Sequence, residues 1–173
     1  MKLLNKFPGL LFLLLSLVVV LFDQGTKIWI INNLALYQDI NVLPVFDITY
    51  VRNHGAAFSF LSDAGGWQRW FFTIIAIVIS VLLTFWMAKT PIKQKLLLTA
   101  YALILGGAIG NVADRMMYGY VVDFLHFYYD SWHFPAFNIA DVAISCGAAL
   151  LILEAFIDFN QSKKDDNSKK IPN

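Results

Sequence analysis

Long apolar runs alternate with shorter polar segments along the chain. Four of these runs approach or exceed the roughly 20 residues that a helix needs to span a bilayer. They cover residues 9–31, 70–88, 96–116 and 139–159. The pattern therefore predicts an all-α membrane protein with four transmembrane helices, built as a single integral membrane domain over residues 1–173.

The first apolar run has two possible interpretations. Lys2 and Lys6 followed by LLFLLLSLVVVLF are typical of a secretory signal peptide. No small-residue cleavage site follows, however, and the chain continues as DQGTKIWII. We therefore expect this run to be retained as a membrane span.

The segments between the spans have different characters. Residues 32–69 contain NVLPVFDITYVRN, whose Val, Ile, Phe, Thr and Tyr residues favour a small sheet or hairpin, interrupted by Pro44. Residues 117–138 are rich in aromatic side chains, which favour the membrane–water interface. We expect a small extracytoplasmic β-rich subdomain between the first and second helices, and an interfacial loop between the third and fourth.

The lysines indicate how the chain is oriented. Most of them precede the first span, join the second to the third, or follow the fourth: Lys2, Lys6, Lys89, Lys93, Lys95, Lys163, Lys164, Lys169 and Lys170. Positive charge favours the cytoplasmic side. We therefore expect both termini in the cytoplasm and the loops 32–69 and 117–138 outside. The polar tail, 161–173, is expected to be disordered.

Composition excludes some classes of protein. The chain is 58% hydrophobic and 14% charged, with a formal net charge of +1. No basic patch with interleaved aromatics is present, which argues against nucleic-acid binding. The single cysteine, Cys146, cannot form an intrachain disulfide, and it lies in an apolar run.

Polar side chains collect at the outer ends of the predicted spans. They are Asp23, Lys27, Asn111, Asp114, Arg115, Asp123, Asn138 and Asp141. Ionisable residues within a membrane usually face a bundle interior or a wet cavity and mark a functional site. A purely structural polar cluster is the alternative. Four carboxylates at one depth favour function.

The carboxylates differ in their neighbours along the chain. Lys27 follows Asp23 at i+4, and Arg115 is adjacent to Asp114, so we expect these two carboxylates to be ionised and structural. Asp123 and Asp141 have no cation within a helical turn. Two such carboxylates held together share one proton, which is the arrangement of an aspartic protease.

Several smaller features fit such a site. Gly106 and Gly110 form a G-x-x-x-G motif that allows a second helix to approach closely. Asn53 is placed to supply a hydrogen bond from the outer loop. Gly55, with Ala56 and Ala57, is small and leaves room for a substrate.

Three other chemistries compete with this hypothesis. A serine–lysine dyad lacks a suitable serine, since Ser16 lies too deep and Ser59 and Ser62 have no nearby lysine. A metal could bind His126, Asp130 and His133 if that loop were helical, although the spacing matches no strong zinc motif. A proton- or ion-coupled transporter would use the same carboxylates, but the polar residues do not continue to the cytoplasmic side.

An ordered set of motifs resembles the bacterial lipoprotein signal peptidase family, also called signal peptidase II. The motifs are DQGTK at 23–27, RNHGAAFS at 52–59, GGAIGNVADR at 106–115, VVDF at 121–124 and FNIAD at 137–141. Each motif alone is weak, whereas the ordered set is specific and spans most of the chain.

The resemblance implies an aspartic endopeptidase of the bacterial inner membrane. Such an enzyme cleaves prolipoproteins just before a cysteine that carries diacylglycerol, requires no metal or organic cofactor, and is inhibited by cyclic peptide antibiotics such as globomycin. The resemblance places the catalytic pair at Asp123 and Asp141 and the structural positions at Asp23 and Asp114. It makes Asn53, Asn111, Arg115 and Asn138 residues that shape the site or contact substrate. Four spans could hold this site in a monomer.

Overall fold

Four long helices form the membrane part of the protein in the computed structural model, which describes residues 6–55 and 66–169 and, beyond Lys163, the backbone alone. The first begins as a 3-10 turn, η1 (Pro8–Phe12), and continues as α2 (Leu13–Asn33). The others are α3 (Trp67–Lys89), α4 (Lys95–Met117) and α5 (Ile139–Lys169). All four are long and apolar enough to cross a membrane, which confirms the helices that the hydrophobic pattern predicts.

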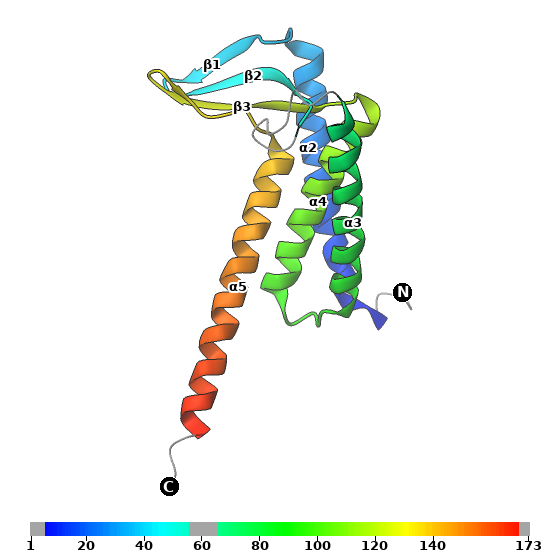
Figure 1. Cartoon of the computed structure of the whole chain (residues 1–173), viewed down its shortest axis with the longest axis vertical. Coiled ribbons are helices and arrows are strands. Elements are labelled where there is room, and N and C mark those ends of the chain that lie inside the picture. Colours follow the sequence, from blue (N-terminus) through cyan, green and yellow to red (C-terminus); the bar gives the residue numbers. More distant parts are fainter. Residues whose placement is uncertain (1–5, 56–65, 170–173) are drawn as a thin grey trace.

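A four-stranded antiparallel sheet lies at one end of the helices (Figure 1). Its strands run in the order β1 (Asp39–Leu43), β2 (Phe46–Asn53), β3 (Val121–Tyr129) and β4 (Trp132–His133). The hairpin β1–β2 is the predicted subdomain between the first two spans. The described chain begins and ends at the opposite end of the helices from the sheet.

The second half of the sheet was not predicted. Residues 121–129, expected to be part of an interfacial aromatic loop, form β3 and pair with β2. Their sequence, VVDFLHFYY, consists mainly of β-branched and aromatic residues, which favour strands. Because β2 offers a free edge to such a segment, the sheet is built from both outer loops and joins residues that lie about 70 positions apart.

An apolar cluster fixes the sheet on the helices. Ile30 and Leu34 at the end of α2 pack against Tyr50 of β2 and against Val122 and Phe124 of β3. All five side chains are buried. Burial of these side chains from water, at about 1.5–3 kcal/mol each, holds β2 and β3 above the end of α2.

Helix α4 lies at the centre and packs against α2, α3 and α5. Its glycines allow close approach, as the G-x-x-x-G motif predicts. A Cβ added at Gly106 would lie 2.7 Å from the Cβ of Val19 in α2, and one added at Gly107 would overlap the carbonyl oxygen of Ala140 in α5. Helices α2, α4 and α5 are therefore packed closely against one another.

Helix α5 extends further than expected. The sequence predicts a disordered tail from residue 161, whereas α5 continues to Lys169 in the structure. The segment 161–169 contains neither proline nor glycine, and its lysines are tolerated in a helix. Residues 170–173 lie outside the described part of the chain.

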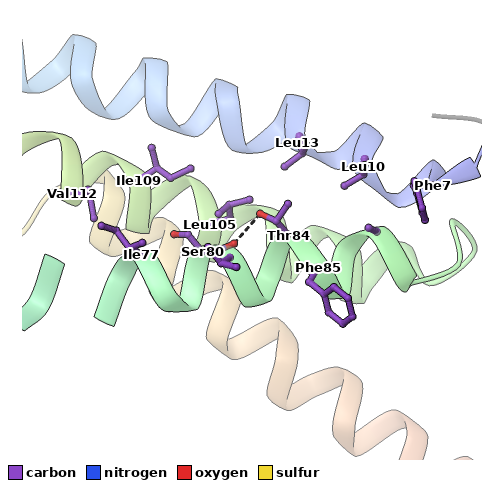
Figure 2. Close-up of a pocket in the computed structure, with 12 residues that line it drawn as sticks. Phe7, Leu10, Leu13, Ile77, Ser80, Thr84, Phe85, Leu105, Ile109 and Val112 are labelled. Atoms are coloured by element: carbon purple, nitrogen blue, oxygen red, sulfur yellow. Dashed lines mark hydrogen bonds between the residues drawn. The ribbon is translucent and has the colours of Figure 1, made fainter. Parts of the chain in front are cut away.

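An apolar cavity of about 730 Å³ lies between η1, α2, α3 and α4 (Figure 2). Among the described residues that line it, only Ser80 and Thr84 are polar. Their hydroxyls donate to carbonyls of the same helix, Ser80 to Ala76 O at 2.7 Å and Thr84 to Ser80 O at 2.8 Å. None of its described lining residues is ionisable, so this cavity carries no candidate chemistry.

Candidate active site

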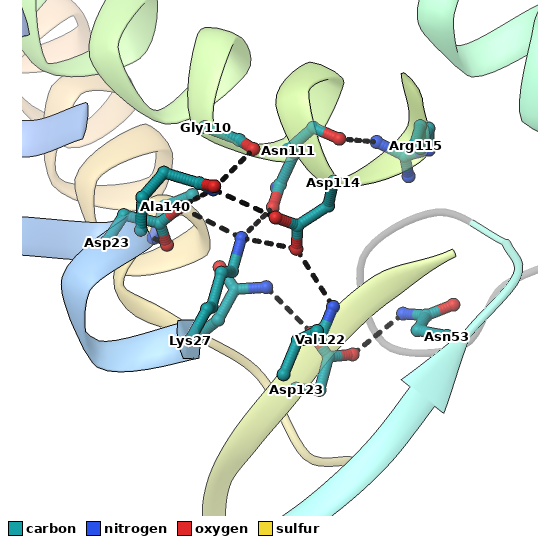
Figure 3. A network of polar contacts seen from close by, with 12 residues as sticks. Asp23, Lys27, Asn53, Gly110, Asn111, Asp114, Arg115, Val122, Asp123 and Ala140 are labelled. Atoms are coloured by element: carbon teal, nitrogen blue, oxygen red, sulfur yellow. Dashed lines mark hydrogen bonds and ion pairs between the residues drawn. The ribbon is translucent and has the colours of Figure 1, made fainter. Parts of the chain in front are cut away.

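A buried lysine connects two carboxylates at the sheet end of the helices (Figure 3). Lys27 Nζ lies 2.9 Å from Asp23 Oδ2 and 3.0 Å from Asp114 Oδ2. The predicted i, i+4 pair of Asp23 and Lys27 is confirmed. The expected pairing of Asp114 with Arg115 is wrong, because adjacent residues point to different sides of a helix.

Arg115 bonds to the backbone. Its Nη2 donates to Gly55 O at 2.7 Å, and its Nη1 donates to Asn111 O at 3.4 Å. The guanidinium also lies over the ring of Phe72, 5.7 Å from the centroid. Arg115 therefore ties the end of β2 to α4 and α3.

The two carboxylates paired with Lys27 also bind backbone amides. Asp114 Oδ2 accepts from Val122 N at 3.0 Å, and Asp23 Oδ1 accepts from Ala140 N at 2.9 Å. Val122 immediately precedes Asp123, and Ala140 immediately precedes Asp141. The Lys27 cluster thus holds the backbone next to each of the two remaining carboxylates.

Asparagine side chains surround Asp123 and Asp141. Asp123 accepts from Asn53 Nδ2 at 2.9 Å and from Asn138 Nδ2 at 2.7 Å, one on each oxygen. Asp141 accepts from Asn111 Nδ2 at 2.8 Å and from the backbone N–H of Asn138 at 3.3 Å. Asn138 thus bonds to both carboxylates and brings them into one site.

Asn138 is also the N-cap of α5. Its Oδ1 accepts from Asp141 N at 2.9 Å, while Asp141 Oδ2 accepts from Asn138 N. This reciprocal pair is a capping box, in which two otherwise unpaired helix-end amides are satisfied. The spacing of Asn138 and Asp141 in FNIAD therefore starts the helix and places the carboxylate at the same time.

Electrostatics favour a shared proton in this site. Burial and the charge of Asp141 raise the pKa of Asp123 to about 7, and the hydrogen bonds from Asn53 and Asn138 lower it only in part. Although neither carboxylate has a cation within a helical turn, Arg115 and Lys27 interact with the pair through space. A carboxyl group with such a pKa can be protonated at neutral pH.

The structure brings the sequence-predicted polar residues together at one end of the helices. Nine of these residues are buried and belong to one connected network of hydrogen bonds and ion pairs: Asp23, Lys27, Asn53, Asn111, Asp114, Arg115, Asp123, Asn138 and Asp141. Gly55 contributes through its backbone, since its N–H donates to Asn53 Oδ1 at 2.9 Å. Ala56, Ala57, Ser59 and Ser62 lie outside the described residues.

Sequence reasoning missed Gln24. Its Nε2 lies 2.8 Å from Asp114 Oδ1 and 3.1 Å from Gly110 O, which ties α2 to α4. Its position beside Asp23, inside an apolar run, could have identified it as part of the site.

His126 and His133, the two histidines considered for a metal site, are not among the residues that bond within this network. His126 is on β3 and His133 on β4, with His126 Nε2 3.2 Å from His133 Nδ1. The segment is a hairpin, so the helical spacing considered for a metal does not form. Across the described residues, no three His, Cys, Asp or Glu side chains are grouped as a metal would require.

Comparison with known proteins agrees with the motifs. Residues 15–157 match the family described as signal peptidase (SPase) II. The chain is 54% identical over 165 residues to a lipoprotein signal peptidase of Shewanella pealeana, covering 95% of this chain and 97% of that one. It is 56% identical over 148 residues to that of Pasteurella multocida, covering 86% and 90%.

The fold also matches solved structures. A bacterial membrane enzyme solved by the in meso method at 2.3 Å resolution superposes with a TM-score of 0.76 at 33% identity, over 94% of this chain and 92% of that one. A second, at 1.9 Å resolution, gives 0.71 at 36% identity, over 83% and 91%. Since sequence and fold agree over most of the length, the chain belongs to the signal peptidase II family of aspartic-type peptidases.

Proposed function

We propose that this protein cleaves the signal peptide from diacylglyceryl-modified prolipoproteins, on the N-terminal side of the lipidated cysteine, with Asp123 and Asp141 as the catalytic pair. The observation that carries the proposal is the joint hydrogen bonding of both carboxylates to Asn138. Asp23 and Asp114, in contrast, are both paired with Lys27.

The reaction follows from one proton shared by two carboxyl groups. The ionised carboxylate takes a proton from water, whose oxygen attacks the scissile carbonyl carbon, while the protonated one donates to the carbonyl oxygen. When the tetrahedral intermediate collapses, the C–N bond breaks and a proton passes to the departing amine. The products are a free carboxyl group on the signal peptide and a free amino group on the lipidated cysteine.

The two carboxyl groups differ in their surroundings, and this difference supports different roles for them. Asp141 lies in the first turn of α5, where the positive end of the helix dipole favours a negative charge. Asp123 lies on a strand, and its pKa is raised to about 7. We assign the initial proton to Asp123 as the general acid and the role of base to Asp141.

The membrane placement follows from charge and shape. Lysines concentrate at the end of the helices opposite the sheet, which supports a cytoplasmic position for that end and an outer position for the sheet. In this orientation the site lies at the extracytoplasmic surface of the bacterial inner membrane. A lipid-anchored peptide bond meets water at that level, so a substrate entering laterally would keep its acyl chains in lipid.

The test is a cleavage assay with purified protein and a diacylglyceryl prolipoprotein. Asp123→Asn and Asp141→Asn should each abolish cleavage, while Asp130→Asn, an exposed carboxylate at the β3–β4 turn, should leave it intact. Both inactive variants should insert into membranes and elute as folded protein. Near-normal processing by either one would show that the pair is assigned wrongly. A globomycin-type cyclic peptide should block the wild-type reaction.

A further inference from the structure

A small cavity, called the Asp141 cavity below, adjoins the carboxylate pair at the start of α5. Its volume is about 250 Å³. Six described residues line it: Phe134, Phe137, Asp141, Val142, Ser145 and Cys146. Since Asp141 is itself part of the wall, the cavity is joined directly to the proposed catalytic pair.

The Asp141 cavity runs from the site towards the middle of the membrane. Asp141 lies in the first turn of α5, which leads away from the sheet to the opposite end of the helices (Figure 1). Cys146 follows five residues later, so the α5 wall of the cavity is about 7.5 Å long. Val142, Ser145 and Cys146 are exposed, and they lie in a helix that is apolar enough to cross a membrane. The cavity is therefore open sideways to lipid.

Two aromatic rings form the wall of the cavity on the sheet side. Phe134 and Phe137 come from the segment between β4 and α5, and their ring centroids lie 5.8 Å apart at 87°, an edge-to-face pair. The backbone of this segment is bonded to β3, since Phe134 N donates to Phe127 O at 2.8 Å and Phe137 N to Leu125 O at 3.1 Å. The sheet thus holds this wall in place.

The lining suits a group that is polar at one end and apolar beyond it. Asp141 and Ser145 supply the carboxylate and the hydroxyl among the described lining residues, and the others are two phenyl rings, a valine and a thiol. A diacylglyceryl group has two ester linkages on its glycerol, followed by acyl chains. A serine hydroxyl can donate to an ester carbonyl, and an apolar wall can bury methylene groups.

The size of the Asp141 cavity limits which part of the substrate it can hold. A signal peptide crosses the bilayer as roughly 20 residues of helix, far longer than this cavity. The volume is also below the roughly 300–1,000 Å³ of sites for drug-sized ligands, so two whole acyl chains do not fit. A glycerol with the first methylenes of its chains does.

We infer that the Asp141 cavity binds the glycerol end of the diacylglyceryl group on the substrate cysteine, with the acyl chains continuing along α5 into the membrane. The inference rests on the proposed cleavage reaction. The modified cysteine directly follows the scissile bond, so its side chain branches off beside Asp141. Ser145 and Cys146 are then specificity residues, because their small side chains leave the room that the lipid occupies. An unmodified cysteine would leave this room unused, which favours the lipidated substrate.

The first measurement locates the lipid. A diacylglyceryl prolipoprotein with a diazirine on an acyl chain, close to the glycerol, is bound to Asp123→Asn protein, which is expected to bind without cleaving, and is irradiated. Mass spectrometry should find adducts on Val142, Ser145 or Cys146. A matched substrate carries the diazirine on the residue before the cysteine and should not label these three positions. Lipid adducts confined to other residues, or labelling of these positions by the peptide probe instead, would overturn the inference.

The second measurement fills the cavity. Cys146→Trp should raise KM and lower kcat/KM for the diacylglyceryl substrate by about tenfold, the effect of losing the burial of about two methylene groups. Val18→Trp is the matched control, because Val18 is also exposed on a membrane helix. Its depth is similar, since Val18 and Cys146 lie five and six residues inward from Asp23 and Ala140, which bond to each other. This control should keep the wild-type kcat/KM.

A substrate with an S-glyceryl cysteine, which lacks both acyl chains, separates loss of lipid binding from a general defect. The indole of Cys146→Trp lies at the inner end of the cavity, where acyl methylenes are expected, so its effect on kcat/KM should largely disappear with this substrate. If Cys146→Trp and wild type cleave the diacylglyceryl substrate equally well, the cavity is not the lipid site, although the peptidase assignment stands. If wild-type protein cleaves no prolipoprotein, both the proposed function and this inference fail.

Discussion

At the scale of single residues, three asparagine amides determine how the two carboxylates are held. Each amide oxygen accepts a defined donor: Gly55 N–H for Asn53, Lys27 Nζ for Asn111, and Asp141 N–H for Asn138. Because the oxygen is occupied, each amide NH₂ must point the other way, towards Asp123 or Asp141. The orientation of the pair is therefore fixed by three neutral amide side chains.

The first residue-scale prediction concerns Asn53. Its hydrogen bond to Asp123 favours the charged carboxylate, so Asn53→Ala should raise the pKa of Asp123 above about 7. In the proposed mechanism cleavage requires protonated Asp123, so kcat/KM should fall with rising pH through about 7 in the wild type. In the variant, this alkaline limb should move up by about one pH unit while the maximal rate falls.

The pH profile of kcat/KM, measured on detergent-solubilised protein, checks this. Asn41→Ala in β1 is the control, because Asn41 is exposed and its amide bonds to Leu43, Asp47 and Tyr128 rather than to the pair. An alkaline limb that stays in place, or moves to lower pH, in Asn53→Ala would contradict the proposed role of Asp123 as acid.

The second residue-scale prediction concerns Lys27, which is a positioning residue for Asp141 as well as a structural cation. Lys27→Met leaves two buried carboxylates without a cation and should destabilise the protein by about 3–5 kcal/mol. Combining it with Asp23→Asn and Asp114→Asn removes the buried charges, and the amide oxygens can still accept from Ala140 and Val122. Thermal unfolding should show a large part of the stability restored in this triple variant.

Activity separates the two roles of Lys27. The triple variant lacks the donor that fixes the Asn111 amide, so kcat should stay well below the wild-type value even where stability has recovered. A kcat that returns together with stability would mean that Lys27 acts on stability alone.

At the scale of elements, α4 is the piece on which the site is assembled. Its polar end supplies Asn111, Asp114 and Arg115, and its glycines bring α2 and α5 against it. Gly110 lies where α4 meets both α2 and α5: an added Cβ would lie 2.5 Å from Asp23 Oδ2 and 3.4 Å from the Cβ of Ala140. The packing of the helices and the geometry of the ionic cluster therefore depend on the same residue.

Gly110→Ala should consequently reduce both stability and activity. The added methyl group displaces the Asp23 carboxylate from Lys27 or separates α4 from α5, at a cost of about 1–3 kcal/mol. Gly25→Ala in α2 is the matched control, since nothing lies within 4 Å of a Cβ there, and alanine should stabilise that helix by up to about 1 kcal/mol. Equal unfolding midpoints for the two variants would contradict this account of α4.

Sequence alone predicted the helices and the depth of the polar residues, because both depend on local patterns: apolar length for the spans and position within a span for Asp23, Asp114 and Asp141. It did not predict β3, although VVDFLHFYY favours a strand, because a strand needs a partner and β2 lies about 70 residues earlier. The contacts of Asp23 with Ala140 and of Asp114 with Val122 could not be predicted either. Both use a backbone N–H, which every residue except proline has, so the residue type does not indicate them.

At the scale of the whole molecule, the membrane helices and the sheet hold Asp123 where the folded protein disfavours its charge. The side chain is 1% exposed, and its pKa lies at about 7 in the folded protein, against 3.8 for an aspartate carboxyl group in water. The folded state therefore binds a proton more tightly than the unfolded state. This contribution to stability is fully present below about pH 4 and is lost as pH rises to about 7.

Asp123→Asn should reveal how much stability the wild type loses when Asp123 ionises, because the amide cannot ionise. The unfolding midpoint of the variant, relative to wild type, should be higher at pH 8 than at pH 4.5, whatever the pH-independent effect of exchanging an oxygen for a nitrogen. Asp158→Asn, at an exposed position of α5, should give the same difference from wild type at both pH values. If the Asp123→Asn difference is also equal at the two pH values, Asp123 is not held as a proton-binding group by the fold. If the difference grows as predicted while cleavage is lost, the proton that the folded protein holds on Asp123 is also the one that the reaction requires.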